Sequence, residues 1–238
     1  MRVTTWNMHR AMDSGDSDAG WSALRDTSVA PLQETRPPTA AAEGTLLFER
    51  VANGSRRTWG TAIWAPSLNL RQLDHRRSER GTAVVAEHLT PAGPVTFISI
   101  YAKLEPLLDT SFAITTMHRV LSDLTEFFEN PKRRGRIIVG GDFNANPAFD
   151  DNRRDTVRGT HDLLFDRLEL WGMQSVIPYR ENAHPTWFPR GSGKPFQLDH
   201  IFVSNEIAFD ASPANLVRHD ELSDHAQLHV DIDESQWT

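Results

Sequence analysis

The chain has 238 residues, 39% of them hydrophobic, and a formal net charge of -7. This length and composition suffice for one sizeable core, so we expect a single domain over residues 1–238. The acidic balance argues against a protein held on nucleic acid by bulk positive charge. Because the chain has no cysteine, disulfides and thiolate metal sites are excluded.

The amino-terminal residues from Met1 to Trp6 are too polar for the apolar core of a signal peptide. No stretch approaches the roughly 18 apolar residues of a transmembrane helix. We therefore expect a cytoplasmic protein without membrane contact. Nothing in the sequence indicates an obligate protein partner.

Apolar, β-prone runs recur along the chain and predict strands at residues 2–6, 29–33, 59–64, 81–87, 95–101, 136–140, 197–204 and 226–232. In one of them, Phe97, Ser99 and Tyr101 have the period of two that is expected when one face of a sheet is buried.

Three segments predict helices. Over residues 109–129 apolar side chains recur at steps of three and four, the spacing of an amphipathic helix that ends at Asn130-Pro131. A second helix is predicted over 162–171, with Gly172 as its stop, and a weaker third over 21–27. Strands outnumber helices, so we expect an α/β fold: a four-layer α/β/β/α sandwich of two mixed, mostly antiparallel sheets flanked by helices.

Short polar clusters lie at or just after several of the apolar runs: Trp6-Asn7, Gln33-Glu34, Gly141-Asp142-Phe143-Asn144, Leu198-Asp199-His200 and Ser223-Asp224-His225. Carboxylates, amides and a histidine at strand ends can converge on one rim of a sheet, where they can bind a divalent cation and polarise a phosphate. The clusters therefore indicate metal-assisted cleavage of a phosphoester.

Asp142 and Asn144 follow a buried-strand run and lie two residues apart, so in an extended segment they face the same side. An ionised Asp142 can accept a proton from a nucleophilic water, and Asn144 can hold that water or a phosphate oxygen without adding negative charge. The alternative is a simple turn after a strand, because Asp and Asn are common turn residues.

His225 is a histidine beside a carboxylate, just before the last predicted strand. In its charged form it can stabilise the charge that develops on phosphorus, and Asp199 from another strand could orient its imidazole. A structural histidine is the alternative. Glu34 offers the hard oxygen that Mg²⁺ or Mn²⁺ prefers, although a glutamate at a strand end is commonly just solvated.

Taken together, the clusters resemble the motifs of the endonuclease/exonuclease/phosphatase superfamily, to which deoxyribonuclease I, exonuclease III and the apurinic endonucleases belong. The resemblance runs from Trp6 to His225 and includes Ile100-Tyr101. It implies Glu34 as the principal metal ligand, with Asp224 either near the metal or in the next layer of residues behind its ligands. It also implies that Asp142 activates the attacking water. The residues that would orient this water and the phosphate are Asn7 and Asn144.

The same resemblance implies that His225 contacts the scissile phosphate and that Asp199 orients His225. Tyr101 would hydrogen-bond a phosphate oxygen, or else be a buried structural tyrosine. His9 departs from the pattern, because apurinic endonucleases have an acid two residues after the asparagine. No catalytic role is therefore assigned to His9, and a second metal ligand on this loop is left without support.

Loops decide the substrate in this superfamily, whose members cut DNA, RNA, phosphoinositides and sphingomyelin. Trp187 could stack on a base or pack against the sheet, and Arg190 and Lys194 could clamp a phosphate or stay solvated. We expect a Mg²⁺- or Mn²⁺-dependent nuclease with a nucleic acid substrate. The alternatives are a phosphatase of small molecules such as inositol phosphates and a non-catalytic binding module that has kept the fold.

Overall fold

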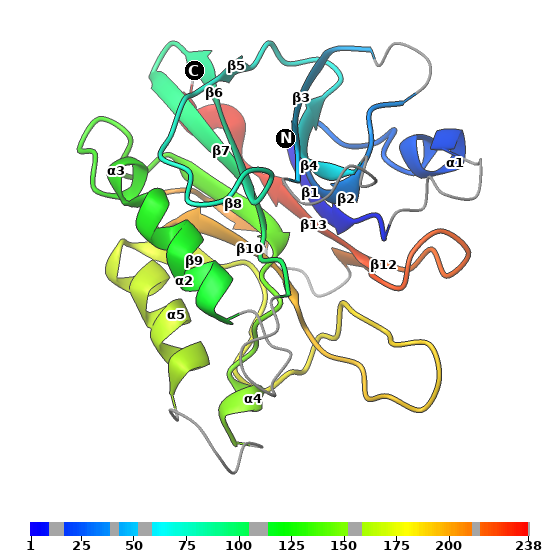
Figure 1. Cartoon of the computed structure of the whole chain (residues 1–238). Coiled ribbons are helices and arrows are strands. Elements are labelled where there is room, and N and C mark those ends of the chain that lie inside the picture. Colours follow the sequence, from blue (N-terminus) through cyan, green and yellow to red (C-terminus); the bar gives the residue numbers. More distant parts are fainter. Residues whose placement is uncertain are drawn as a thin grey trace.

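The computed structural model describes residues 1–9, 17–38, 43–51, 59–104, 114–151, 159–210 and 215–237. Two β-sheets lie face to face between helices (Figure 1). Helices α2 (Ile114–Asp123), α3 (Thr125–Phe128) and α5 (Thr160–Leu170) lie on one outer side, and α1 (Ser17–Ser22) lies on the other. The expected α/β/β/α sandwich is confirmed.

The first sheet has the order β11-β13-β1-β2-β4-β3, and β12 also pairs with β13. Its strands are β1 (Arg2–Asn7), β2 (Ala30–Thr35), β3 (Thr45–Arg50), β4 (Gly60–Ala65), β11 (Phe209–Asp210), β12 (Leu216–Val217) and β13 (Gln227–Ile232). Among these pairs β1–β2 is parallel and the others are antiparallel.

The second sheet has the order β5-β6-β7-β8-β10-β9. Its strands are β5 (Arg71–Gln72), β6 (Ala83–Thr90), β7 (Gly93–Tyr101), β8 (Ile137–Asp142), β9 (Met173–Ser175) and β10 (Asp199–Ser204). Here β7–β8 is the parallel pair. The sheets are therefore mixed and mostly antiparallel, as the sequence predicts. The described residues also include the short helix α4 (Ala148–Asp151) and a 3₁₀ helix (Glu234–Trp237).

Apolar side chains fill the space between the layers. The inner faces of the two sheets meet through a buried cluster that includes Val3, Val29, Ile63, Val84, Phe97, Ile138, Ile201, Leu228 and Val230. On the outer face of the second sheet, Met117 and Leu121 of α2 and Phe165 of α5 pack against its strands. These contacts explain the alternation along β7, because Phe97 belongs to the inner layer and Ile98 to the outer one.

The structure corrects the helix that was predicted over residues 21–27. Helix α1 ends at Ser22, and a turn follows. The hydrogen bonds show why: the Ala23 amide still bonds to Ala19, four residues back, but the Leu24 amide bonds to Trp21, three residues back. The backbone thus tightens from an α-helix into a turn, and Trp21 and Leu24 serve as anchors on the outer face of the first sheet.

The helix that was predicted over residues 109–129 is two helices, α2 and α3, separated by Leu124, and residues 109–113 lie outside the described ranges. All the predicted strands are present with shifted ends. Strand β3 was missed because it is only half-buried, and β5, β9, β11 and β12 were missed because two or three residues are too short to show a period. Within the described ranges, no helix is long and apolar enough to cross a lipid bilayer.

The parallel pairs bring polar strand ends together. In the first sheet Asn7 at the end of β1 lies opposite Gln33, next to Glu34. In the second sheet Asp142 at the end of β8 lies between Tyr101 on β7 and Asp199 on β10. One rim of each sheet therefore carries the predicted site residues.

Two glycines let the backbone pack closely beneath this rim. A Cβ atom on Gly141 would lie 2.0 Å from the carbonyl oxygen of Ile100 on β7. A Cβ atom on Gly140 would lie 3.0 Å from the Pro31 ring and 3.2 Å from the Thr5 side chain, both in the other sheet. Side chains at these positions would push β8 away from its neighbours, so the Gly-Gly pair permits the close approach of the two rims.

Candidate active site

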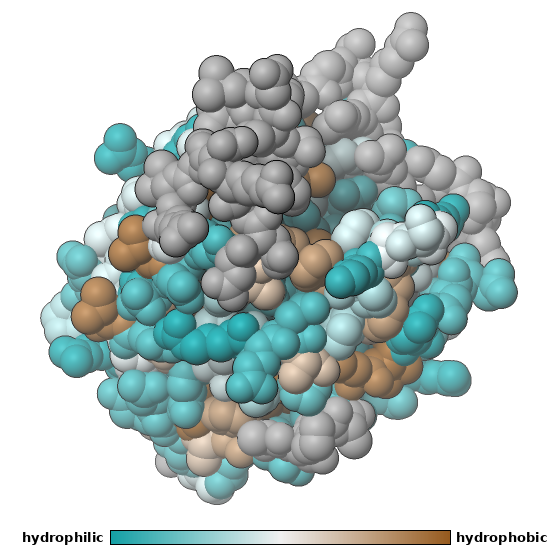
Figure 2. All heavy atoms as spheres, turned by 90° about the horizontal axis from the view of Figure 1, so that it is seen from below, coloured by the Kyte–Doolittle hydropathy of each residue, from teal (hydrophilic) through white to brown (hydrophobic). Residues whose placement is uncertain are grey.

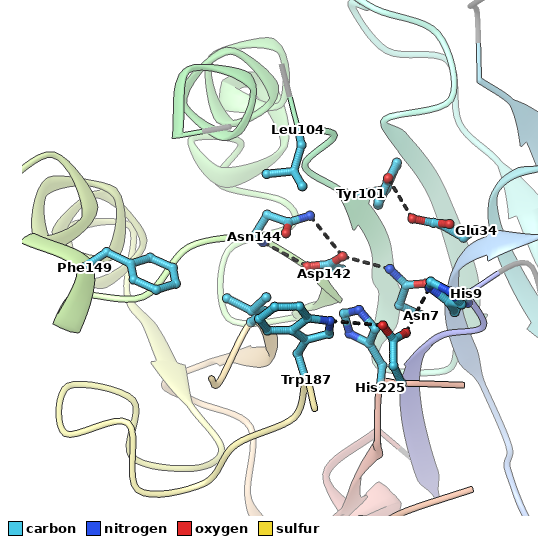
Figure 3. A pocket seen from close by; sticks show the side chains of 12 residues that line it. Asn7, His9, Glu34, Tyr101, Leu104, Asp142, Asn144, Phe149, Trp187 and His225 are labelled. Atoms are coloured by element: carbon cyan, nitrogen blue, oxygen red, sulfur yellow. Dashed lines mark hydrogen bonds and ion pairs between the residues drawn. The ribbon is translucent and has the colours of Figure 1, made fainter. Parts of the chain in front are cut away.

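A pocket of about 370 Å³ opens where the rims of the two sheets meet (Figure 3). It is lined by Asn7, His9, Glu34, Tyr101, Leu104, Asp142, Asn144, Phe149, Trp187, Leu198, Asp224 and His225. The structure therefore brings these predicted site residues together in one pocket: Asn7, Glu34, Tyr101, Asp142, Asn144, Trp187, Asp224 and His225. Asp199 lies behind His225 and is fully buried.

Asp142 is held at the centre of the pocket by three N–H donors. Asn7 Nδ2 and Asn144 Nδ2 donate to Oδ2 at 2.8 and 3.1 Å, and the Asn144 amide donates to Oδ1 at 2.9 Å. Burial and the nearby charge of Asp199 raise the pKa of Asp142 to about 7, against the lowering effect of His225 and of the Asn7 hydrogen bond. A carboxylate with this pKa can take up a proton near neutral pH.

His225 forms a hydrogen-bonded pair with Asp199: the distance from its Nδ1 to Oδ2 is 2.7 Å. Burial alone would lower the pKa of His225, but the Asp199 carboxylate beside it prevails and raises the pKa to about 9. His225 is therefore a cation at neutral pH. Since Asp199 occupies Nδ1, Nε2 is the ring nitrogen left for the pocket.

Glu34 and Tyr101 form the wall opposite Trp187 (Figure 3). The Tyr101 hydroxyl donates to Glu34 Oε1 at 2.9 Å, and both side chains are largely buried. Tyr101 is therefore a buried strand residue that also lines the pocket, and its contact with a phosphate oxygen stays a prediction.

Backbone strain is concentrated at this site. Glu34, Asn144 and His9 have positive φ angles of 48°, 47° and 44°. Residues other than glycine adopt this left-handed conformation at a cost of about 1–3 kcal/mol each, and such residues are common at functional sites.

Asp224 is held between two nitrogen atoms. His9 Nδ1 lies 2.9 Å from Oδ1, and Trp187 Nε1 donates to Oδ2 at 3.2 Å. Burial acts to raise the pKa of Asp224, but the contact with His9 and the charge of His225 outweigh it, so that the pKa is lowered. Trp187 also bridges to Phe196 and His225 through its backbone, so its place beside the pocket is fixed.

Ser223 connects Asn7, at the end of β1, with His225, in the segment just before β13. Its hydroxyl donates to the Asn7 carbonyl oxygen at 2.7 Å and accepts from the His225 amide at 3.0 Å. Because Ser223 is buried, replacing it by alanine leaves both groups without this partner. Ser223→Ala is expected to lower the free energy of unfolding by about 1–3 kcal/mol, measured by urea denaturation. Ser192→Ala, in an exposed loop, is the control, and equal losses in both variants would contradict this role.

Sequence reasoning missed the apolar part of the pocket. Leu104, Phe149 and Leu198 line it together with the Trp187 ring. Single apolar residues in loops or in a helix as short as α4 carry no pattern that could have revealed this. Arg190 and Lys194 lie in an exposed loop and do not line the pocket. Their proposed contact with a phosphate stays a prediction.

The part of the chain that matches a known protein family spans the site residues. The sequence model of the Endonuclease/Exonuclease/phosphatase family matches residues 5–225, from just before Asn7 to His225. The chain belongs to this family. No curated protein sequence matches significantly.

Solved structures of similar fold include several nucleases. A 3′-5′ exonuclease from Neisseria meningitidis has a TM-score of 0.66 at 20% identity, over 98% of this chain and 100% of its own. An AP endonuclease from Archaeoglobus fulgidus has a TM-score of 0.67 at 14% identity, over 98% and 99%. A 3′ phosphatase from Neisseria bound to a product DNA hairpin has a TM-score of 0.66 at 19% identity, over 98% and 99%. At these identities the likeness shows the fold.

Proposed function

We propose that this family member is a divalent-metal-dependent phosphodiesterase, a nuclease that hydrolyses DNA or RNA by in-line attack of water on phosphorus. One observation carries the proposal: a buried carboxylate with a pKa of about 7, Asp142, and a cationic imidazole, His225, line one pocket. A base and a cation that titrate on either side of pH 8 are suited to activating water and stabilising phosphate charge.

The donors in the pocket fit a hard divalent cation. Within the described ranges, no three histidine or acidic side chains are arranged to hold a metal ion. Glu34 offers a carboxylate and Asn7 an amide oxygen, and the Asp224 carboxylate lies near them in the same pocket. Mg²⁺ is typically held by one or two carboxylates and keeps several waters, so this set suits Mg²⁺ or Mn²⁺. When bound, the cation would neutralise the charge of the phosphate and polarise its oxygens.

The side chains of the pocket have the other catalytic roles. Asp142 accepts the proton of the attacking water, which Asn7 and Asn144 orient from the two sides of that carboxylate. His225 donates from Nε2 to a phosphate oxygen, while Asp199 holds the ring. The Tyr101 hydroxyl lies beside Glu34, where it can contact either the carboxylate or a second phosphate oxygen. These are the roles that general acid–base and electrostatic catalysis require.

The surface favours a polar substrate. On the face seen in Figure 2, the described surface is mainly hydrophilic, and the hydrophobic side chains lie in small separate groups. This speaks for a nucleic acid over a lipid bilayer, and the DNA hairpin bound to the similar Neisseria phosphatase agrees with it. The second candidate is a phosphatase of small molecules, favoured by the net charge of -7 and by a pocket of about 370 Å³, which is the size of a small-molecule site.

A substrate panel tests the proposal. The purified full chain is incubated with Mg²⁺ or Mn²⁺ and with plasmid, single-stranded DNA, RNA or inositol phosphates, and the same reactions are run with EDTA. We expect metal-dependent cleavage of at least one nucleic acid, and its loss in His225→Asn. Release of phosphate from inositol phosphates with intact nucleic acids would favour the phosphatase. No turnover of any substrate would favour a binding module.

A further inference from the structure

His9 is turned into the pocket by its backbone and fixed by two contacts. Its φ angle is 44°, its amide donates to Asn7 Oδ1 at 2.9 Å, and its Nδ1 lies 2.9 Å from Asp224 Oδ1. The side chain is 42% exposed and lies on the same side of the pocket as Asn7 and Glu34 (Figure 3). No described residue pairs with Nε2, so this nitrogen has a free lone pair when Nδ1 carries the proton.

Asp224 is poorly placed to serve as a direct ligand. Each of its oxygens already faces a nitrogen, Oδ1 that of His9 and Oδ2 that of Trp187. A carboxylate engaged in this way loses contacts when a cation takes its oxygens. The same carboxylate is well placed to hold the His9 ring. Histidines that bind metals commonly give their other ring N–H to a carboxylate, which fixes the tautomer and makes the free nitrogen a better donor.

We infer that His9 Nε2 is a ligand of the catalytic cation beside the Glu34 carboxylate, and that Asp224 orients His9. The inference rests on the proposed function, since it concerns the same cation. It also agrees with the absence of a cluster of three such ligands within the described residues, because only two of these side chains then bind directly. Waters and the substrate complete the coordination.

An imidazole nitrogen changes the preference of the site. Oxygen ligands suit both Mg²⁺ and Mn²⁺, whereas imidazole suits transition metals such as Zn²⁺ and Fe²⁺, and the affinity of a site with nitrogen and oxygen ligands rises along the series that starts at Mn²⁺. The site is therefore selective for a divalent transition cation over Mg²⁺. A site with an acidic residue at position 9 would lack the nitrogen ligand and would not have this preference.

The experiment measures metal binding by the full chain without any substrate. Mn²⁺ and Mg²⁺ affinities are determined by calorimetry, and nitrogen coordination by the ¹⁴N modulation of Mn²⁺ in pulsed electron paramagnetic resonance. His9→Asn is the test variant, because asparagine tolerates the left-handed backbone. We expect it to lose the ¹⁴N signal and to weaken Mn²⁺ binding by about 10–100-fold, with a smaller effect on Mg²⁺. His184→Asn, which lies outside the pocket, is the matched control.

Absence of the ¹⁴N signal in the wild type, or its persistence in His9→Asn, would overturn the inference. A second variant, His225→Asn, is expected to keep the signal, and its loss there would assign the nitrogen to His225 and contradict the role of His9. Failure of the proposed function looks different. In that case the His9-dependent signal is present, but no nucleic acid is cut in the substrate panel.

Discussion

Asp142→Asn is expected to lower kcat by a factor on the order of 10²–10⁴. The variant keeps the size of the side chain but cannot accept the proton of the attacking water. Since burial raises the pKa of Asp142 to about 7, the folded protein carries a costly buried charge above that pH. Asparagine removes this charge, which offsets the hydrogen bonds from Asn7 and Asn144 that it cannot accept equally well. At pH 8 we therefore expect little loss of stability.

Single-turnover kinetics and thermal unfolding on the same samples check this prediction. Asn146→Asp is not a suitable control because Asn146 is fully buried and hydrogen-bonded. The exposed Asp74 offers a better one, and Asp74→Asn should leave both measurements unchanged. A variant at Asp142 that retained more than about a tenth of the wild-type rate would exclude this residue as the general base.

The second large effect is expected for Asp199→Asn. The Asp199 carboxylate is what raises the pKa of His225 to about 9 against the effect of burial. Without it, burial prevails and His225 loses its proton at neutral pH, so the phosphate loses a cationic donor. Removing one such electrostatic contact typically costs about 10²–10³ in kcat.

The pH profile of kcat/KM distinguishes this cause from a loss of structure. The active form has Asp142 ionised and His225 protonated, so the wild-type rate should rise through about pH 7 and fall through about pH 9. In Asp199→Asn the alkaline limb should move to lower pH. The acid limb should follow, because the charge of Asp199 also raises the pKa of Asp142. A lower rate with unmoved limbs would reject the orienting role of Asp199.

Much of the fold and the site could be predicted because the spacing of apolar residues and the polar residues that end each strand are local features of the sequence. The alternation along β7 and the apolar run of β8 report directly which faces are buried. The polar residues that end these strands then had to meet, since β7 and β8 are parallel neighbours. The single-domain expectation stays a prediction.

What the sequence could not reveal depends on contacts between distant segments. The left-handed backbone at Glu34 could not be predicted, because glutamate rarely adopts this conformation and nothing else in its sequence marks it. The contact between His9 and Asp224 joins residues from opposite ends of the chain. The sequence alone made His9 only a departure from a family pattern, and its neighbours in the folded pocket give it a chemical role.

Hydrolysis in ¹⁸O-labelled water tests the central claim most directly. A nucleic acid that the protein cleaves in the substrate panel is digested by the full chain with Mn²⁺ in this water, and the masses of the products are measured by mass spectrometry. If Asp142 activates a water that attacks phosphorus, one ¹⁸O atom appears on the phosphate for each bond cut, and the rate of this labelled cleavage falls in Asp142→Asn by a factor on the order of 10²–10⁴. Cleavage that leaves the phosphate unlabelled, or that continues undiminished in Asp142→Asn, would contradict the account.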